Sequence, residues 1–157
     1  MNNLILSLVA GLGATLAIGV LSYAEVSLTE VVLLMAPFGA TAVLVFGVPS
    51  SPLAQPKNVI IGHFITASIG IAFSQYVEIT PITLAIATGL GVSAMLITKT
   101  THPPAGANPI LIMASGQGWS FLFTPVLIGA VVIVLVGKAL QLLQSQYLNP
   151  CLNGQKT

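Results

Sequence analysis

Apolar residues fill long stretches of this chain, and polar residues gather in the short stretches between them. A helix needs about 20 predominantly apolar residues to cross a bilayer. Four uninterrupted stretches come close to that length, at residues 3–22, 59–76, 80–98 and 124–143. Thr80-Pro81 and Thr124-Pro125 are good pairs for the cap and first turn of the helices they precede.

Two further apolar segments are interrupted by proline and glycine. Ser27-Leu-Thr-Glu30 has the spacing of a capping box and predicts the start of the second segment, which Pro37 and Gly39 interrupt. Lys99–Pro109 interrupts the fifth segment, because Pro103 and Pro104 lack backbone N–H groups and hold the residues before them extended. The pattern therefore predicts six membrane-crossing segments, with the second and fifth broken near the midplane.

The two interrupted segments are related by an internal repeat. Pro37-Phe-Gly-Ala-Thr-Ala-Val-Leu-Val45 aligns with Pro104-Ala-Gly-Ala-Asn-Pro-Ile-Leu-Ile112 at an offset of 67 residues, and the same offset carries Gly62 onto Gly129. The chain then divides into repeat 1, about 3–77, repeat 2, about 80–143, and a polar tail, 144–157. Because each repeat crosses an odd number of times, the two must be inverted. This is a common plan of secondary transporters.

Composition limits the possible function. Of 157 residues, 55% are hydrophobic and only 4% charged, so residues 1–157 form a single transmembrane domain of the all-α class. The net charge of +1 does not favour nucleic acid as a partner. Cys151 is the single cysteine, which excludes a disulfide within the chain. Because no metal-ligand cluster or nucleophile–base set stands in the membrane segments, we expect no metal, no cofactor and no enzymatic activity.

The repeat predicts a binding site for a small anion. A helix that starts inside the membrane presents free N–H groups and the positive end of its dipole, and such ends bind anions. Two helices starting after the breaks would direct these groups into one pocket, with Thr41 and Asn108 at equivalent positions. In the alternative interpretation, the glycines only permit tight packing and Thr41 and Asn108 only cap short helices. The candidate binding residues are Gly39, Ala40, Thr41, His102, Gly106, Ala107 and Asn108, and the helix breaks are Pro37, Pro103 and Pro104.

His102 and two further residues have two interpretations each. His102 precedes the second break, where it could line a cytoplasmic vestibule and attract an anion or carry a proton, or could simply bond a loop carbonyl. An ionisable group such as His63 inside a membrane segment is a functional candidate by default, although it could also pack between helices. Lys99 could steer substrate or extend its charge to the interface.

Two long motifs make the chain similar to the HPP family of small integral membrane proteins. They are His102-Pro-Pro-Ala-Gly-Ala107 and the run from Ala36 to Asn58, which continues to Gly62-His63. Members from cyanobacteria and chloroplast envelopes are known as nitrite transporters, and some others carry soluble regulatory domains. The resemblance implies nitrite as the substrate and a cyanobacterial inner or plasma membrane as the location, whereas the residues themselves imply only a small anion.

The function expected from the sequence is transport of a small monovalent anion, with nitrite as the leading candidate. A channel or facilitator for a small neutral solute is one alternative, and a structural subunit without transport activity is another. The lipid bilayer is the expected environment. Small-residue ridges such as Gly11, Thr15 and Gly19 outnumber the contacts that one bundle needs, which predicts a homo-oligomer.

Lysine placement predicts the topology. With six crossings and a cytoplasmic N-terminus, all four lysines lie at or near the cytoplasmic side, where positive charge is enriched, so both termini are cytoplasmic. In a background in which Cys151 is replaced by serine, we expect a cysteine at position 51 to react with an impermeant reagent from inside and a cysteine at position 120 to react from outside. Labelling of position 120 from inside alone would rule out six crossings.

Overall fold

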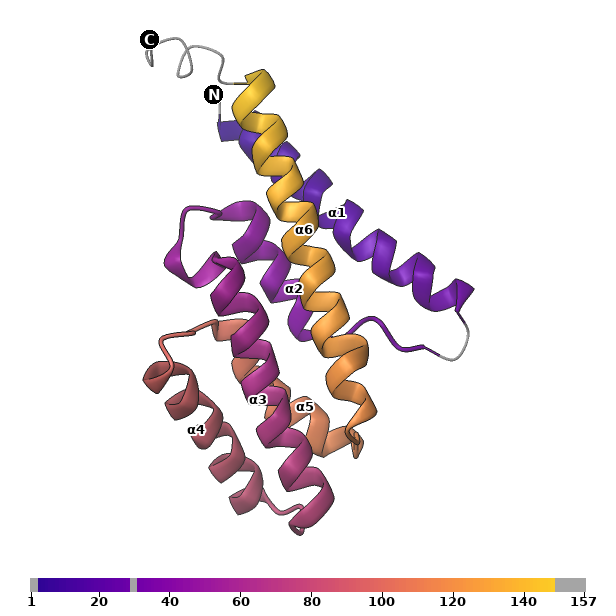
Figure 1. The fold of residues 1–157 in the computed structure, drawn as a ribbon, viewed down its shortest axis with the longest axis vertical. Coiled ribbons are helices and arrows are strands. Elements are labelled where there is room, and N and C mark those ends of the chain that lie inside the picture. The colour runs from indigo at the N-terminus through magenta and orange to yellow at the C-terminus, as the bar shows by residue number, and fades with distance from the viewer. Residues whose placement is uncertain (1–2, 29–30, 149–157) are drawn as a thin grey trace.

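The computed structural model describes residues 3–28 and 31–148, and within them the chain is entirely helical apart from its connections (Figure 1). The all-α prediction is confirmed. The six α-helices are α1 (Asn3–Ser27), α2 (Pro37–Ala42), α3 (Pro56–Tyr76), α4 (Pro81–Ile97), α5 (Asn108–Ser115) and α6 (Ile128–Leu143). Short helical turns lie between them, η1 (Val43–Gly47), η2 (Pro52–Ala54), η3 (Pro103–Ala107) and η4 (Leu122–Leu127), and η5 (Gln144–Leu148) follows α6.

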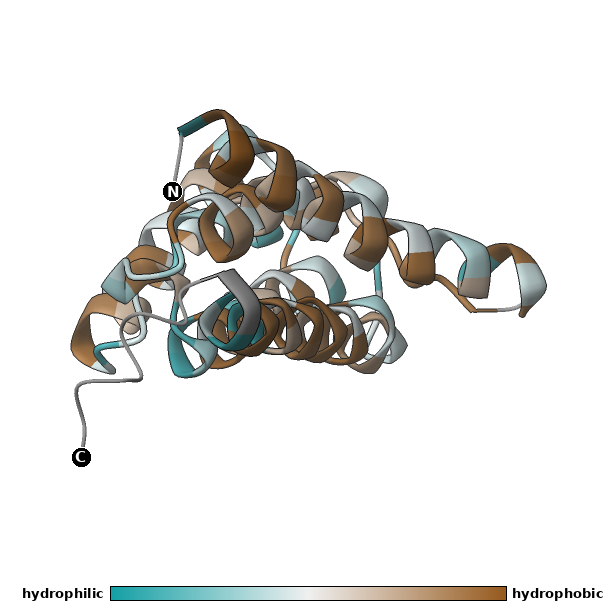
Figure 2. Ribbon diagram, turned by 90° about the horizontal axis from the view of Figure 1, so that it is seen from above, coloured by the Kyte–Doolittle hydropathy of each residue, from teal (hydrophilic) through white to brown (hydrophobic). Residues whose placement is uncertain are grey.

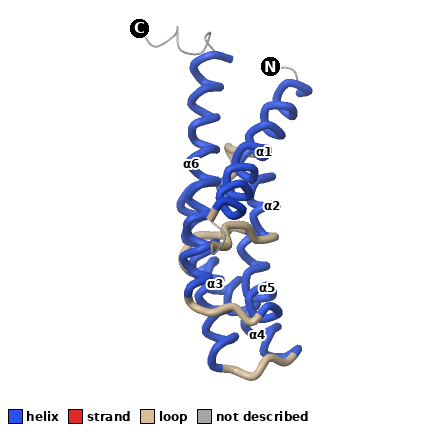
Figure 3. Tube along the Cα trace, turned by 90° about the vertical axis from the view of Figure 1, so that its right-hand side faces the viewer, coloured by secondary structure: helices blue, strands red, loops and turns tan. Residues whose placement is uncertain are grey.

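The helices are staggered along the long axis of the molecule rather than aligned in one layer. In Figures 1 and 3, α1 and α6 form one end and α3, α4 and α5 form the other, with α2 between the two groups. Helix α3 is central, because it contacts α4, α5 and α6 and also the η3 turn. This position brings the middle of α3 against both proline-interrupted segments.

Three of the predicted crossings have the length and composition of complete membrane spans. They are Asn3–Ser27, Pro56–Tyr76 and Leu122–Gln146. Pro37–Gly47 and Pro81–Ile97 are shorter apolar helices, and α5 has only 8 residues. At 1.5 Å per residue, a helix as short as α5 covers about 12 Å, which is well below the hydrocarbon thickness. The structure thus supports a multi-pass membrane protein with three full-length spans.

The outer surface of the bundle is apolar, as a lipid-facing surface must be. Leu8, Leu12 and Leu16 of α1 are each more than half exposed, and hydrophobic colour covers much of every long helix in Figure 2. In water such a surface would be a severe liability, because soluble proteins rarely expose large continuous apolar patches. In a bilayer it faces acyl chains.

The expected start of the second segment is wrong. Helix α1 continues through Ser27, so this residue does not open a new helix; Thr29 and Glu30, the rest of the proposed capping box, lie outside the described residues. Residues 31–36 are not helical, and the next helix begins at Pro37. One carboxylate oxygen of Glu25 accepts the backbone N–H groups of Leu33 and Leu34, each at 2.8 Å. This charge-assisted pair satisfies donors that an extended stretch would otherwise leave free.

The predicted helix start at Thr80-Pro81 is confirmed in detail. Thr80 caps α4: its hydroxyl accepts the backbone N–H of Thr83, and its own backbone N–H donates to the Thr83 hydroxyl. Pro81 occupies the first turn, where its missing N–H costs nothing. Thr124, the other predicted cap, does not cap α6: it has extended backbone angles inside η4, just before Pro125, and α6 begins at Ile128 with Leu127 at its N-cap position.

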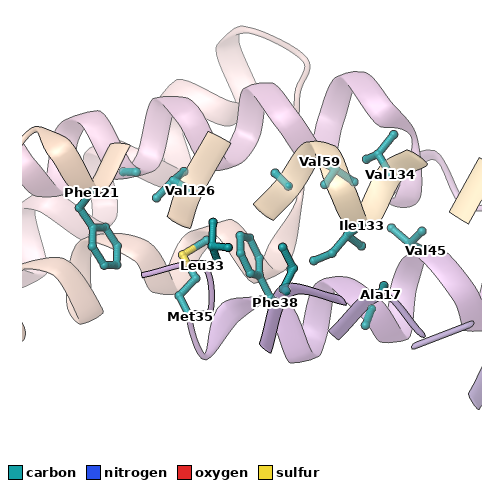
Figure 4. Packing of buried hydrophobic residues seen from close by; sticks show 14 of the residues in the cluster. Ala17, Leu33, Met35, Phe38, Val45, Val59, Phe121, Val126, Ile133 and Val134 are labelled. Carbon is teal, nitrogen blue, oxygen red and sulfur yellow. The ribbon is translucent and has the colours of Figure 1, made fainter. Parts of the chain in front are cut away.

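The hydrophobic core lies between the N-terminal half and α6. Phe38 is fully buried and points from α2 toward α6, close to Leu33 and Met35 from the extended stretch before it (Figure 4). Val126 and Ile133 meet this group from η4 and α6. Burial of Phe38 therefore fixes the position of α2, which is too short to hold its place by itself.

Glycines on α3 allow backbone to approach backbone. A Cβ at Gly62 would lie 2.9 Å from the Thr100 carbonyl oxygen, and one at Gly70 would lie 2.8 Å from Pro109 Cα. By contrast, a Cβ at Gly11 or Gly19 would meet nothing within 4 Å. The small residues Gly62 and Gly70 of α3 are thus packed inside the molecule, whereas the small-residue ridge of Gly11, Thr15 and Gly19 on α1 faces outward.

We expect Gly70→Ala to destabilise the protein and Gly19→Ala to leave it unchanged or slightly more stable. The new methyl group at position 70 would overlap backbone atoms that cannot turn aside, at a cost of about 1–3 kcal/mol. Thermal unfolding in detergent measures the difference. Equal stability of the two variants would contradict this packing of α3 against α5.

Candidate functional site

Thr41 lies at the centre of a buried polar cluster. Pro37 starts α2, and Thr41 follows one turn later on the side of the helix that faces α3. Its hydroxyl oxygen lies 2.8 Å from Nε2 of His63, 3.0 Å from Nε2 of His102 and 3.2 Å from the Pro37 carbonyl oxygen. One hydroxyl group therefore connects two histidines that are distant in the sequence.

His63 is held on its other side by the first residue of α5. The side-chain nitrogen of Asn108 lies 3.0 Å from His63 Nδ1, and the same nitrogen donates to the His63 carbonyl oxygen at 3.2 Å and to the Thr66 hydroxyl at 3.0 Å. Thr66 in turn donates to the Gly62 carbonyl oxygen. Both ring nitrogens of His63 therefore have partners, and the histidine bridges α2 and α5.

His102 is hydrogen-bonded to the loop before α3. Its Nδ1 lies 2.8 Å from the Leu53 carbonyl oxygen in η2. The neighbouring Thr101 carbonyl accepts a hydrogen bond from Asn58, which strengthens the same connection. The close approach of His102 to α3 requires Gly62, since a Cβ there would lie 3.1 Å from His102 Cβ.

Donors and acceptors assign one neutral tautomer to each histidine. The Leu53 carbonyl can only accept, so Nδ1 of His102 carries hydrogen and its Nε2 accepts. Asn108 Nδ2 is assigned as a donor because it faces the His63 carbonyl, so His63 Nδ1 accepts and its Nε2 carries hydrogen. Thr41 therefore accepts from His63 and donates to His102. The two imidazoles are in opposite tautomers.

The cluster is fully buried and contains no carboxylate. Thr41, His63, Thr66, His102 and Asn108 are all fully buried. The Phe38 ring stands edge-on to the His63 ring with centroids 5.4 Å apart, and the two imidazole centroids are 5.0 Å apart. Oδ1 of Asn108 is buried and has no hydrogen-bond partner among the described residues. The site thus offers several donors and one open acceptor.

The structure brings four of the candidate residues together and separates the rest. Thr41, His63, His102 and Asn108 form the cluster. The repeat had placed Thr41 and Asn108 at equivalent positions facing one site, and both contact His63. His102, however, is fully buried and does not line an open vestibule, because it is enclosed between η2 and α3. Lys99 is exposed, takes a left-handed backbone conformation with φ of 54° and has no part in the cluster.

The remaining candidates lie beside the cluster. Gly39, Ala40 and Ala107 are exposed and Gly106 is half-buried. The N–H of Gly39 donates to the Ala36 carbonyl at 3.1 Å, and the N–H of Asn108 donates to Ala105, so these two donors are not free in this conformation. The tight turns at the two helix starts take up both N–H groups. The sequence had instead predicted that these groups are free and converge on one pocket.

An open apolar groove of about 910 Å³ separates the two proline motifs. All three break prolines border it, together with Ala40 and Ala107. One wall comes from α2 and η1, and the other from η3 and α5; the lining residues are Ala36, Pro37, Ala40, Val43 and Leu44 on one side and Pro103, Pro104, Ala107, Ile110, Leu111 and Ala114 on the other. Ala40 and Thr41 are neighbours, so α2 separates the groove from the buried cluster.

Sequence reasoning missed two partners in the cluster. Thr66 was not among the candidates, although its position three residues after His63 places both on one helix face. The Leu53 carbonyl is a backbone group in a proline-rich loop, and no side-chain pattern marks it. A spacing search among buried polar residues could have found the first partner but not the second.

Comparisons with known proteins agree with the resemblance seen in the sequence. The profile described as "HPP, transmembrane region" matches residues 2–148. Two transmembrane proteins of Dictyostelium discoideum are 36% and 35% identical to this chain over 128 residues, covering 76% of it in each case. The alignments cover 45% and 41% of those relatives, so the chain spans less than half of their length. No solved structure matches the chain.

We expect His102→Ala to destabilise the protein by roughly 2–5 kcal/mol, because it opens a cavity and leaves the Leu53 carbonyl unpaired. This differs from the expectation for a loop residue with little packing. Lys99→Ala is the control, since this exposed neighbour touches no member of the cluster. Thermal unfolding in detergent compares the two, and an unchanged His102→Ala protein would refute the buried position of this histidine.

Proposed function

The chain belongs to the HPP family of integral membrane proteins, and from this premise we propose that it is a transporter of a small monovalent anion, with nitrite as the leading substrate. The proposal is of a transporter rather than an enzyme. The observation that carries it is the environment of His63, whose two ring nitrogens contact Thr41 and Asn108. These two residues are 67 positions apart, the spacing of the repeat.

The groove supports an arrangement of two related halves. Most of its lining residues form pairs at the repeat offset of 67. The pairs are Ala36 with Pro103, Pro37 with Pro104, Ala40 with Ala107, Val43 with Ile110 and Leu44 with Leu111. A passage between two equivalent motifs is the plan expected of a transporter built from repeats. We infer that substrate enters between α2 and α5.

Backbone contacts elsewhere support the same relation. Gly62 packs against the Thr100 carbonyl, and Gly129, which is 67 positions later, packs against the Leu33 carbonyl, which is 67 positions before Thr100. The first helix of each half also packs on the third helix of the other half, α1 on α6 and α4 on α3. These reciprocal contacts are what an inverted pair of three-segment repeats would make.

The chemistry of the cluster favours an anion over a cation. N–H and O–H groups of His63, Thr41 and Asn108 are available as donors once the bonds between them open. No carboxylate contacts them in the described part of the chain, and a carboxylate would be expected in a cation site. A small outward movement of α2 would turn Thr41 from the cluster toward the groove, since Ala40 already lines it.

Two other functions remain as alternatives. A facilitator for a small neutral solute would use the same groove without saturation at low concentration. A structural subunit would use the apolar faces of α1 and α4 and would move no solute. Purified protein in liposomes distinguishes all three, because saturable nitrite flux supports the transporter, non-saturable flux supports the facilitator and the absence of flux supports the subunit.

We expect Gly39→Val and Gly106→Val each to reduce nitrite flux strongly in liposomes at alkaline pH, where little nitrite crosses as uncharged acid. A Cβ at either position meets nothing within 4 Å, so both variants should fold, but a branched side chain hinders the close approach of an anion to the backbone of the two motifs. Gly89→Val is the matched control, an exposed helical glycine on α4 with equally open surroundings. Normal transport by both variants would refute this binding region.

A further inference from the structure

The cluster contains the only described buried groups that can carry positive charge. The sequence holds four Lys and Arg residues together, and all four are lysines. Lys57, Lys99 and Lys138 are exposed, and Lys156 lies outside the described residues. A bare anion in a low-dielectric site is very costly unless an opposite charge accompanies it. Within the described structure, only His63 and His102 can supply that charge at the site.

We propose that the His63–Thr41–His102 cluster binds one proton for each anion, so that transport is electroneutral proton–anion symport. The inference rests on the proposed anion transport and specifies how it is coupled. The proton comes from water on one side of the membrane and returns to water on the other. Loading forms one N–H bond, at Nε2 of His102, and breaks none within the protein.

The geometry around Thr41 accommodates both the empty and the loaded state. In the empty state Thr41 accepts from His63 and donates to His102 Nε2. When that nitrogen gains a proton, Thr41 accepts from both imidazoles and its own hydrogen turns to the Pro37 carbonyl, 3.2 Å away. The empty state does not use the contact between the Thr41 hydroxyl and the Pro37 carbonyl oxygen. In the loaded state, the hydroxyl donates its hydrogen to that carbonyl.

Thr41 also links proton binding to the groove. It belongs to α2, whose residues Pro37 and Ala40 line that groove. A proton on His102 turns the Thr41 hydroxyl toward the carbonyl of Pro37, which lines the groove. Conversely, movement of α2 would separate Thr41 from both histidines. Proton occupancy and the position of this wall therefore depend on each other.

No other titratable group faces the pair in the described structure. The groups that contact the two imidazoles are Phe38 and Thr41 from α2, the Leu53 carbonyl from η2, Gly62 from α3 and Asn108 from α5. None of them is charged or titrates near neutral pH. The proton must therefore be held by the histidines themselves.

Nitrogen-15 NMR of histidine-labelled protein tests the cluster without any transport assay. The chain has two histidines, so single His→Gln variants assign the signals. At alkaline pH we expect His63 to carry hydrogen on Nε2 and His102 on Nδ1, and on acidification we expect one imidazole to gain a second N–H while the other stays neutral. Identical tautomers, or two imidazoles that become charged together, would overturn the proposal.

Proteoliposomes test the coupling directly. With an internal pH indicator and an inward nitrite gradient, we expect protein-dependent acidification at one proton per nitrite, unchanged when a potassium–valinomycin potential is imposed. Thr41→Val should lose this proton movement and Thr41→Ser should retain it. Thr88→Val is the matched control, because its hydroxyl also reaches the carbonyl four residues earlier but lies outside the cluster.

The possible results are distinct for the two claims. Nitrite flux that follows the membrane potential without acidification would overturn proton coupling while leaving anion transport intact. Absence of any protein-dependent nitrite flux would overturn the proposed function itself, whatever the NMR tautomers show. If Thr41→Val does not fold, potential-independent flux with one proton per nitrite in the wild type and in Thr41→Ser still decides the question.

Discussion

The structure depends on the burial of polar side chains in a place where neither water nor lipid can satisfy them. His63 is the central example, because it lies buried in the membrane-spanning helix α3 and both of its ring nitrogens need hydrogen-bond partners there. Thr41 from α2 and Asn108 from α5 provide them, so two segments too short to hold their own position are fixed against α3. An unpaired buried polar group costs about 1–3 kcal/mol, which makes these contacts a strong constraint on how α2 and α5 dock.

Close backbone packing allows that constraint to be met. The extended stretch before the first motif approaches α6 at Gly129, where a side chain would collide with Phe38. The stretch before the second motif approaches α3 at Gly62, where a side chain would collide with the Thr100 carbonyl oxygen. The polar cluster and the apolar groove then lie on the two sides of α2. One short helix is therefore exposed both to the candidate substrate path and to the histidines, and this shared position is the basis of the coupling inferred above.

Part of this arrangement could be predicted from the sequence. The offset of 67 residues pointed to Thr41 and Asn108 as equivalent positions, and Thr80-Pro81 identified a helix start correctly because capping is a local interaction. The burial of His102 could not be predicted, since it depends on a carbonyl of Leu53 that is 49 residues away. The helix start predicted at Ser27 failed because this residue ends α1, where its hydroxyl donates to the Tyr23 carbonyl instead of capping a new helix.

The most direct test of the central claim is an experimental structure of the protein with nitrite bound. The account predicts that nitrite lies between the two proline motifs, in contact with the Thr41 hydroxyl and the Asn108 side chain, with α2 moved so that Thr41 has turned from the histidines toward the groove. Nitrite bound at the bundle surface, away from both Thr41 and Asn108, with the histidine cluster unchanged, would contradict it.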